Sequence, residues 1–257
     1  MTSNRAKIAF AAALFLPSLA SIAHADISGF NNGSGWQLNR GGPGTAASFS
    51  GQQLTATTGG SNDSYNSAIY TTKQSTSHFT ATFTFSNNHG GDGGAFFVEN
   101  DPRGTSAVST FWGSGLGYGG DTPITNSVAV EIDALGNWVG LGINGNTQST
   151  STPGTINLAS NDPIQVVVTY DGTTLSDKFT DTVTGITYSK SYIVNIAQNV
   201  GANAYVGVSG GDGLSTGTQL FTNFSYATPE PSSFILAALG GLALVAVARR
   251  RAVQSRA

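Results

Sequence analysis

The sequence predicts an all-β sandwich, and three features of the chain indicate this fold class. Apolar and polar residues alternate along several short segments, as in strands that bury one face. Many of the 34 glycines, with numerous Ser, Thr and Asn residues, lie between these segments, where tight turns need them. No stretch in the middle of the chain shows a helical period with capping residues. The chain is 39% hydrophobic, which is enough to fill a core between two sheets.

The expected strands follow one another through the middle of the chain. In residues 78–85, Phe and Ala alternate with Thr, so one face is buried and the other carries a row of Thr side chains. Residues 128–132 and 139–143 repeat this alternation. Residues 164–170 form a β-branched strand that ends at Asp171-Gly172, a strong signal for a hairpin turn. Further strands are expected at 178–192, 204–208 and 219–226.

The start of the chain has the pattern of a secretory signal peptide. Arg5 and Lys7 precede a short apolar run at 8–16, and Ala23-His24-Ala25 supplies the small residues of a cleavage site. The run is too short for a membrane-spanning helix. We therefore expect export, with Asp26 as the first residue of the mature protein.

The end of the chain combines three elements in a fixed order. Pro229-Glu230-Pro231 is followed by an apolar helix at 234–248 and by Arg249-Arg250-Arg251. This order resembles the PEP-CTERM sorting signal of Gram-negative bacteria, which implies cleavage by an exosortase-type enzyme. The plain alternative is a permanent C-terminal membrane anchor. The expected boundaries are a signal peptide at 1–25, a sandwich domain at 26–227 and a sorting signal at 228–257.

The overall charge hides a strongly acidic body. The whole chain has a formal net charge of −3, but six of its 11 basic residues and only one of its 14 acidic residues lie in the two end segments. The body keeps 5 basic and 13 acidic residues, a net charge of −8. This argues against nucleic acid and anionic membrane surfaces as partners. The absence of Cys excludes disulfides, thiolate catalysis and Cys-ligated metal sites.

The clearest candidate for chemistry is a pair of carboxylates within residues 128–133. The three apolar residues of this strand face one way, so Glu131 and Asp133 face the other way, about 7 Å apart. Such a pair can act as acid and nucleophile, bind a hard cation, or simply be solvated. No phosphate-binding Gly-Lys-Ser/Thr motif and no nucleophile elbow accompany it, and His78 and His89 are isolated.

Several blocks of the body, taken in order, resemble those of the L-type (legume-lectin-like) lectins. Each block alone is weak, but their order and spacing are similar to the family over most of the body. The resemblance implies a concanavalin-like jelly-roll β-sandwich that binds carbohydrate without catalysis. The matching blocks are 91–97, 113–118, 128–133, 139–144, 166–172, 204–209 and 221–226.

The resemblance also implies a sugar site. In the family a loop Asp accepts hydrogen bonds from sugar hydroxyls, a Gly-rich loop donates a backbone N–H, and an Asn donates its amide. These roles fall on Asp92, on Gly115 with Ser114 beside it, and on Asn137. A variable last loop, here 210–215, tunes specificity. The implied carbohydrate-binding residues are Asp92, Ser114, Gly115, Asn137 and Asp212.

Metal binding is implied as well, with calcium as the expected cofactor. The family's Glu and Asp metal ligands fall on Glu131 and Asp133, and Asn137 would complete the set. The family usually has an Asp and then a His after the Asn. Here the chain passes almost directly into the next strand at 138–140, so both ligands are missing. Without a bound metal ion, Asp92 and Asn137 would be less well oriented.

The aromatic residue that packs near the sugar in the family is also missing. It usually stands two positions before the Asn, and that position is Leu135 here. Trp112 or Trp138 can provide a stacking face instead, although a buried core position is the commoner place for Trp.

Two other functions stay open. Family-16-type glycoside hydrolases carry Glu-x-Asp-x-x-Glu, or a version one residue shorter, on a strand of the same sandwich, and Glu131-Ile132-Asp133 begins this motif. The position of the acid, however, holds Leu135 or Gly136, neither of which transfers a proton. The other alternative is a structural or adhesive matrix protein whose sugar site is degenerate.

The sequence therefore predicts an exported, non-catalytic protein that binds a glycan, such as the exopolysaccharide of its own cell. The expected location is the envelope, the outer surface or the biofilm matrix of a Gram-negative bacterium. The expected partners are the glycan, an exosortase-type enzyme and, transiently through the helix at 234–248, the inner membrane.

Overall fold

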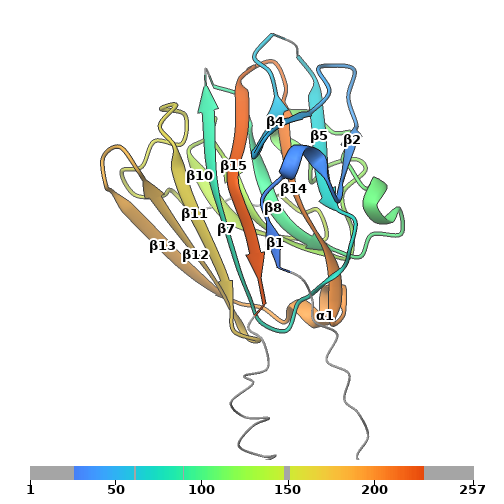
Figure 1. The fold of residues 1–257 in the computed structure, drawn as a ribbon. Helices are drawn as coiled ribbons and strands as arrows, with labels where there is room; N and C mark the ends of the chain where they lie inside the picture. The colour runs from blue at the N-terminus through green and yellow to red at the C-terminus, as the bar shows by residue number, and fades with distance from the viewer. Residues whose placement is uncertain (1–25, 61, 89, 148–150, 229–257) are drawn as a thin grey trace, which may run out of the picture.

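Two antiparallel β-sheets packed face to face make up the fold, which confirms the predicted all-β sandwich (Figure 1). The computed structural model describes residues 26–60, 62–88, 90–147 and 151–228. The predicted signal peptide at 1–25, the predicted helix at 234–248 and His89 lie outside the described residues. No helix within the described ranges is long and apolar enough to cross a membrane.

The first sheet has eight strands, and β7 and β15 lie at its centre. A short strand, β1 (Ile27–Ser28), pairs with the end of β15. In spatial order the other strands are β13 (Thr187–Ile193), β12 (Thr174–Asp181), β11 (Ile164–Tyr170), β7 (Phe79–Asn88), β15 (Thr218–Ala227), β4 (Gln53–Thr57) and β3 (Ser48–Ser50).

The second sheet has seven strands, and it carries the residues of interest. A two-residue strand, β6 (Gln74–Ser75), pairs with the start of β14. In spatial order the other strands are β10 (Trp138–Ile143), β9 (Ser127–Asp133), β8 (Gly93–Glu99), β14 (Asn203–Asp212), β5 (Ser64–Tyr70) and β2 (Trp36–Arg40).

Four short helical segments connect these strands. One is an α-helix of a single turn, α1 (Ile196–Val200), capped by the side chain of Asn195, which accepts a hydrogen bond from Gln198 N. The three 3-10 turns are η1 (Asn31–Gly33), η2 (Gly104–Ser106) and η3 (Gly113–Gly115). The predicted strand at 178–192 is wrong as a single element: it is the end of β12, a turn over 182–186 and β13.

The main core lies between the two sheets and is rich in aromatic residues. Along β7 every second residue is buried, as the Phe/Ala–Thr alternation predicts. Phe83 from the first sheet stacks on Phe96 from the second, with ring centroids 6.0 Å apart. The apolar positions of β9, Val128, Val130 and Ile132, point into the same core.

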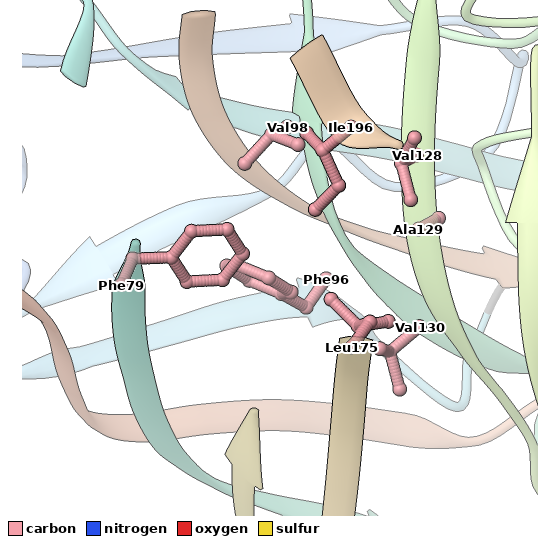
Figure 2. Close-up of a pocket in the computed structure, with 8 residues that line it drawn as sticks. All are labelled: Phe79, Phe96, Val98, Val128, Ala129, Val130, Leu175 and Ile196. Carbon is pink, nitrogen blue, oxygen red and sulfur yellow. The ribbon is translucent and has the colours of Figure 1, made fainter. Parts of the chain in front are cut away.

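A small void in this core lies near α1, at the end of the sandwich opposite to the arrowhead of β7 (Figures 1 and 2). Phe79, Phe96, Leu175 and Ile196 are among the side chains around it, and all of its lining residues are apolar. The space does not admit a water-sized sphere, so it belongs to the packed core and is not a ligand site.

A second apolar cluster covers the other face of the seven-stranded sheet. The long loop 100–126 between β8 and β9 contributes Tyr118 and Ile124, which pack on Phe97 and Ala129 of those strands. The middle strands of this sheet are therefore buried on both faces. The same loop carries η3 to the end of the sheet where β8 begins.

Candidate functional site

Asp92 lies at the end of the sandwich where β8 begins and its two neighbouring strands end. Gly93, the first residue of β8, is paired with Asp133 of β9 on one side and with Gly211 of β14 on the other. The loops that follow β9 and β14 therefore meet around Asp92, together with η3. Residues that are far apart in the sequence come together here, as the resemblance implies.

The Asp92 carboxylate is held in place but keeps one oxygen open. Its Oδ2 accepts a hydrogen bond from Gly213 N at 2.6 Å, while its backbone carbonyl accepts from Ala134 N at 2.8 Å and Leu135 N at 3.2 Å. The residue is 8% exposed, and no hydrogen bond joins its Oδ1 to another described residue. Burial, and then the neighbouring charge of Asp133, raise the pKa of Asp92 above its ordinary value.

The close approach of three loops at this point requires glycine. A Cβ on Gly113 would lie 1.8 Å from Asp92 Oδ2 and 2.2 Å from Gly213 N. Any other residue at position 113 would push the carboxylate and the last loop apart. Both glycines lie in segments that the resemblance singles out, 113–118 and the last loop 210–215, but neither was predicted as a residue that contacts Asp92.

The predicted backbone donor of η3 is engaged inside the protein. Gly115 is buried, and its N–H donates to Trp112 O at 2.7 Å, closing the turn. Ser114, beside it, is exposed. Of the three residues of this turn, only Ser114 is exposed.

Asn137 is half-buried and makes two hydrogen bonds to a neighbouring loop. Its Oδ1 accepts from Leu158 N at 2.9 Å, and its Nδ2 donates to Ile156 O at 3.0 Å. The residue adopts a left-handed conformation with φ of 55°, which Asn tolerates better than most residues. One N–H of the amide is left over.

Asp212 lies beneath the site, fully buried at the end of β14. Gln219 Nε2 donates to its Oδ1 at 3.0 Å and Gly217 N donates to its Oδ2 at 3.3 Å. Burial, and to a smaller extent the nearby Asp92, raise the pKa of Asp212 to about 7. Because no part of it is exposed, Asp212 supports the loop 213–217 from below and offers no contact to a ligand.

The two carboxylates of β9 lie on the face away from the main core, as the alternation predicts, but they differ in access. Asp133 is half-buried, and its Oδ1 accepts from Gly136 N at 2.7 Å. Burial raises its pKa. Glu131 is 0% exposed, and its Oε1 lies 2.3 Å from where a Cβ on Gly142 would be.

Four exposed apolar residues adjoin the groups that lie near Asp92, either in the chain or across the sheet. Trp112 is 61% exposed and precedes Gly113, and Leu214 is 81% exposed and follows Gly213. Leu135, which donates its N–H to the Asp92 carbonyl, and Trp138, which is paired with Asp133, are also exposed. Large apolar side chains in water at one point of the surface indicate a binding site. The expectation that these tryptophans are more often buried is wrong for both.

The family model of the legume lectin domain matches residues 26–233. The chain belongs to the legume lectin domain family. A second family model, the PEP-CTERM protein-sorting motif, matches residues 227–251 and confirms the predicted sorting signal. The chain therefore carries a lectin-like carbohydrate-binding domain with an export and sorting signal.

Solved plant lectins share the fold of this lectin domain. Basic winged bean lectin with Tn-antigen is 21% identical, with a TM-score of 0.65 over 79% of this chain and 97% of that chain. The metal-free form of lectin I-B4 from Griffonia simplicifolia is 21% identical, with a TM-score of 0.65 over 79% and 99%. Arcelin-5, a lectin-like defense protein from Phaseolus vulgaris, is 19% identical, with a TM-score of 0.63 over 79% and 96%. No curated protein sequence matches the chain.

The metal ligands expected in this lectin domain do not fit a resident cation. No group of three or more His, Asp and Glu side chains in the described part of the chain lies close enough to hold a metal ion. The Oδ1 atoms of Asp133 and Asn137 each already accept a backbone N–H. Calcium takes about six to eight oxygen ligands, including waters and backbone carbonyls, and the fully buried Glu131 offers none at the surface where Asp133 and Asn137 lie.

The hydrolase alternative is not supported by this geometry. Glu131, its nucleophile, is fully buried against Tyr118 and Gly142 and has no surface that a substrate reaches. The position of its acid holds the exposed Leu135 or Gly136. A retaining hydrolase needs two accessible carboxyl groups about 5–5.5 Å apart.

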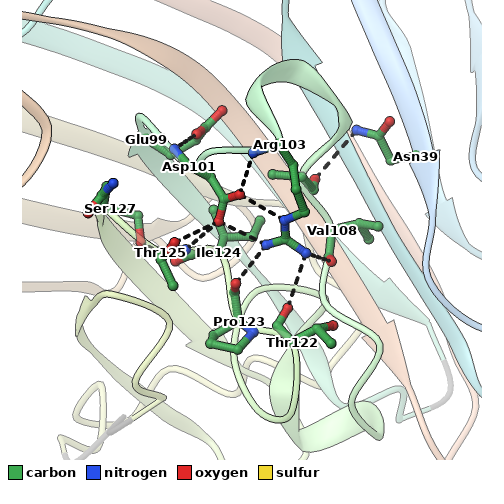
Figure 3. A network of polar contacts seen from close by, with 12 residues as sticks. Asn39, Glu99, Asp101, Arg103, Val108, Thr122, Pro123, Ile124, Thr125 and Ser127 are labelled. Atoms are coloured by element: carbon green, nitrogen blue, oxygen red, sulfur yellow. Dashed lines mark hydrogen bonds and ion pairs between the residues drawn. The ribbon is translucent and has the colours of Figure 1, made fainter.

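An ion pair at the base of the loop 100–126 supports η3 from a distance (Figure 3). Arg103 Nε and Nη2 donate to the two oxygens of Asp101 at 2.8 and 2.9 Å, and its guanidinium also donates to Val108 O and Pro123 O at 2.8 and 2.6 Å. Burial alone would raise the pKa of Asp101, but the hydrogen bonds from Arg103 and Thr125 outweigh it and hold this pKa well below its usual range. Sequence reasoning missed this brace; its only signal is Asp101 and Arg103 two residues apart at a turn.

Proposed function

We propose that this protein is an exported, non-enzymatic lectin that binds a glycan at Asp92. The observation that carries the proposal is the open Oδ1 of Asp92 in a legume lectin domain, with the exposed Trp112 and Leu214 next in the chain to Gly113 and Gly213 at this carboxylate. A carboxylate oxygen accepts hydrogen bonds from sugar hydroxyls. Exposed aromatic and aliphatic side chains cover the apolar face of a sugar ring.

Donors for the sugar's oxygens are available around this carboxylate. Ser114 is exposed and offers its hydroxyl, and the amide of Asn137 has one N–H left over. In this proposal Gly115 shapes the turn that presents Ser114, and Asp212 holds the last loop in place.

The proposal includes a location and a processing route. A signal peptide at 1–25 directs export, and an exosortase-type enzyme acts at 228–257. The lectin domain at 26–227 then works at the cell envelope or in the exopolysaccharide matrix. A neutral glycan suits this site, because several carboxylates lie close together in an acidic domain and would repel an anionic glycan.

A second candidate is a structural or adhesive matrix protein with a silent sugar site. It is favoured by the two predicted donors, Gly115 N–H and the Asn137 amide, that bind partners within the protein. Binding to no glycan at all would support this candidate.

A glycan array probed with the lectin domain tests the proposal, with Asp92→Asn as the variant. The Asn side chain keeps an oxygen that accepts from Gly213 N, so the fold stays intact. Its amide NH₂ takes the place of the open oxygen, so a sugar hydroxyl loses its acceptor. We expect the affinity of Asp92→Asn to be lower by at least about tenfold, the value of a hydrogen bond to a charged group. The matched control is Asp26→Asn, an exposed carboxylate next to β1 that should bind like the wild type. Equal binding by wild type and Asp92→Asn would contradict the proposed site.

A further inference from the structure

Three polar side chains around the site are oriented by backbone N–H groups. Asp92 Oδ2 accepts from Gly213 N at 2.6 Å, Asp133 Oδ1 from Gly136 N at 2.7 Å, and Asn137 Oδ1 from Leu158 N at 2.9 Å. The side chains of a binding site are held in orientation by a bound metal ion or by hydrogen bonds to neighbouring protein groups. Here the chain itself provides those groups.

The donor to Asn137 belongs to a segment that is fixed to the rest of the fold at two places. At its start, Ser151 and Val139 of β10 exchange two backbone hydrogen bonds of 2.8 and 3.1 Å. Further along, Ile156 and Leu158 are each 1% exposed and belong to the main core. We call residues 151–158 the anchored segment. Its backbone cannot move away from Asn137 without taking two apolar side chains out of the core.

The anchored segment is connected to Asp92 through a continuous set of contacts. Asn137 joins the segment to the turn between β9 and β10. In that turn, Ala134 N and Leu135 N donate to the Asp92 carbonyl. The position of the Asp92 carboxylate thus depends on the turn, and the turn depends on Asn137.

We infer that the anchored segment, acting through Asn137, organises this site in the place of a metal ion, so that folding and glycan binding require no divalent cation. This inference rests on the proposed function for the part that concerns glycan binding. Asn137 is then a positioning residue: it clamps the turn between β9 and β10 onto the segment 151–158. Because two side chains of the segment belong to the main core, the segment is fixed by folding, and the site is pre-organised before a ligand binds.

Thermal unfolding of the full chain, purified in mild detergent without any sugar, tests the metal part alone. We expect the melting temperature to change by less than about 1 °C between excess EDTA, CaCl₂ and MnCl₂. A resident ion at a hundred times its Kd would raise the melting temperature by about 5 °C or more. A rise of that size with either cation, or a similar fall with EDTA, would overturn the inference. This result does not depend on whether the protein binds a glycan.

Hydrogen exchange of the same sugar-free protein tests the clamp. In Asn137→Ala, we expect the amides of Leu158 and Leu135 to exchange at least about tenfold faster, because one loses its acceptor and the other lies in the released turn. In Asn137→Asp, which keeps an oxygen for Leu158 N, we expect Leu158 to stay protected. The control is Asn157→Ala, an exposed neighbour in the same segment whose Oδ1 accepts from Ala159 N. Unchanged exchange of Leu135 in Asn137→Ala would overturn the role of Asn137.

If the array identifies a glycan, its affinity is measured with EDTA and with CaCl₂. We expect the two values to agree within about twofold, and a loss of binding in EDTA would overturn the inference. Failure to find any glycan contradicts the proposed function, and the melting and exchange experiments still decide on the anchored segment.

Discussion

At the scale of single residues, buried carboxylates give the protein its pH dependence. Glu99 at the end of β8 and Asp212 at the end of β14 are fully buried, and burial raises the pKa of each to about 7. Asp92 is also buried, and burial is again the main cause that raises its pKa. These groups hold their protons at pH values where exposed carboxyls have lost theirs.

Glycan binding should weaken as the pH falls. A carboxylate accepts sugar hydroxyls best when it is ionised, and the raised pKa of Asp92 brings its protonation to a less acidic pH than for an ordinary Asp. The nearby carboxyls of Asp133 and Asp212 also have raised pKa values. They too gain protons as the pH falls, and the repulsion between their charges and that of Asp92 is then lost. Affinity measured between pH 8 and pH 4 should fall in the wild type and stay flat in Asp92→Asn. A wild-type affinity that rises toward acid pH would contradict this role.

Glu99→Gln should stabilise the protein at pH 8 and not at pH 5. The folded pKa of about 7 lies above the ordinary value of 4.5, so the folded protein keeps a proton that the unfolded chain loses between those pH values. Stability therefore falls as the pH rises through this window, and the full cost is present above pH 7. We expect a gain of about 1–3 kcal/mol at pH 8 in urea unfolding. An equal effect at both pH values would mean that ionisation of Glu99 is not the cause.

The residue pattern predicted part of the site and missed the rest for a physical reason. Asp92 and the two carboxylates of β9 stand in local sequence blocks, so pattern and resemblance find them. The groups that hold them, Gly213 N and Leu158 N, are backbone atoms from distant segments. A backbone N–H carries no signature in the sequence, and only the fold brings it to its partner.

At the scale of elements, alternation identifies a strand only where its two faces differ in residue type, as in β7 and in β9. β7 alternates and was predicted, whereas β5 was not, because the core covers one of its faces and the loop 100–126 the other. Its sequence, SYNSAIY, is buried at six of seven positions with no alternation. The hairpin β12–β13 was read as one strand because its turn, 182–186, contains Val, Thr and Ile and no Asn-Gly or Asp-Gly pair.

The loop 100–126 is the element whose support is easiest to remove. In Arg103→Ala, Asp101 keeps a charge that is 6% exposed and has lost its ion pair. We expect a loss of about 2–4 kcal/mol in urea unfolding, together with weaker glycan binding because η3 loses its brace. Arg40→Ala is the control, since its exposed guanidinium donates only to the nearby carbonyls of Gly42 and Pro43. Equal stability of the two variants would show that the brace contributes nothing.

At the scale of the whole molecule, the acidic body selects against anionic ligands. The net charge of −8 over residues 26–227 gives the domain a negative potential, and the ends of β9 and β14 bring Asp133 and Asp212 near Asp92. The sequence predicted this feature fully, because charge is additive along the chain and needs no fold.

Neutral glycans should therefore bind better than matched glycans that carry uronate or sulfate groups. We expect the preference to be larger at 20 mM than at 150 mM NaCl, because salt screens repulsion between separated charges over about 8–10 Å near physiological ionic strength. Pairs of neutral and acidic glycans on one array, probed at both salt concentrations, provide the measurement. A preference for the acidic partner that grows at low salt would contradict the electrostatic argument.

The loops around Asp92 are the proposed glycan site. The most direct test is a titration of the ¹⁵N-labelled lectin domain with its array-selected glycan, followed by two-dimensional NMR. We expect the largest amide shifts at Ser114, Leu135 and Gly213, one from each of the three loops that meet at Asp92. Shifts that concentrate near α1 or along β13 while these three amides stay in place would contradict it.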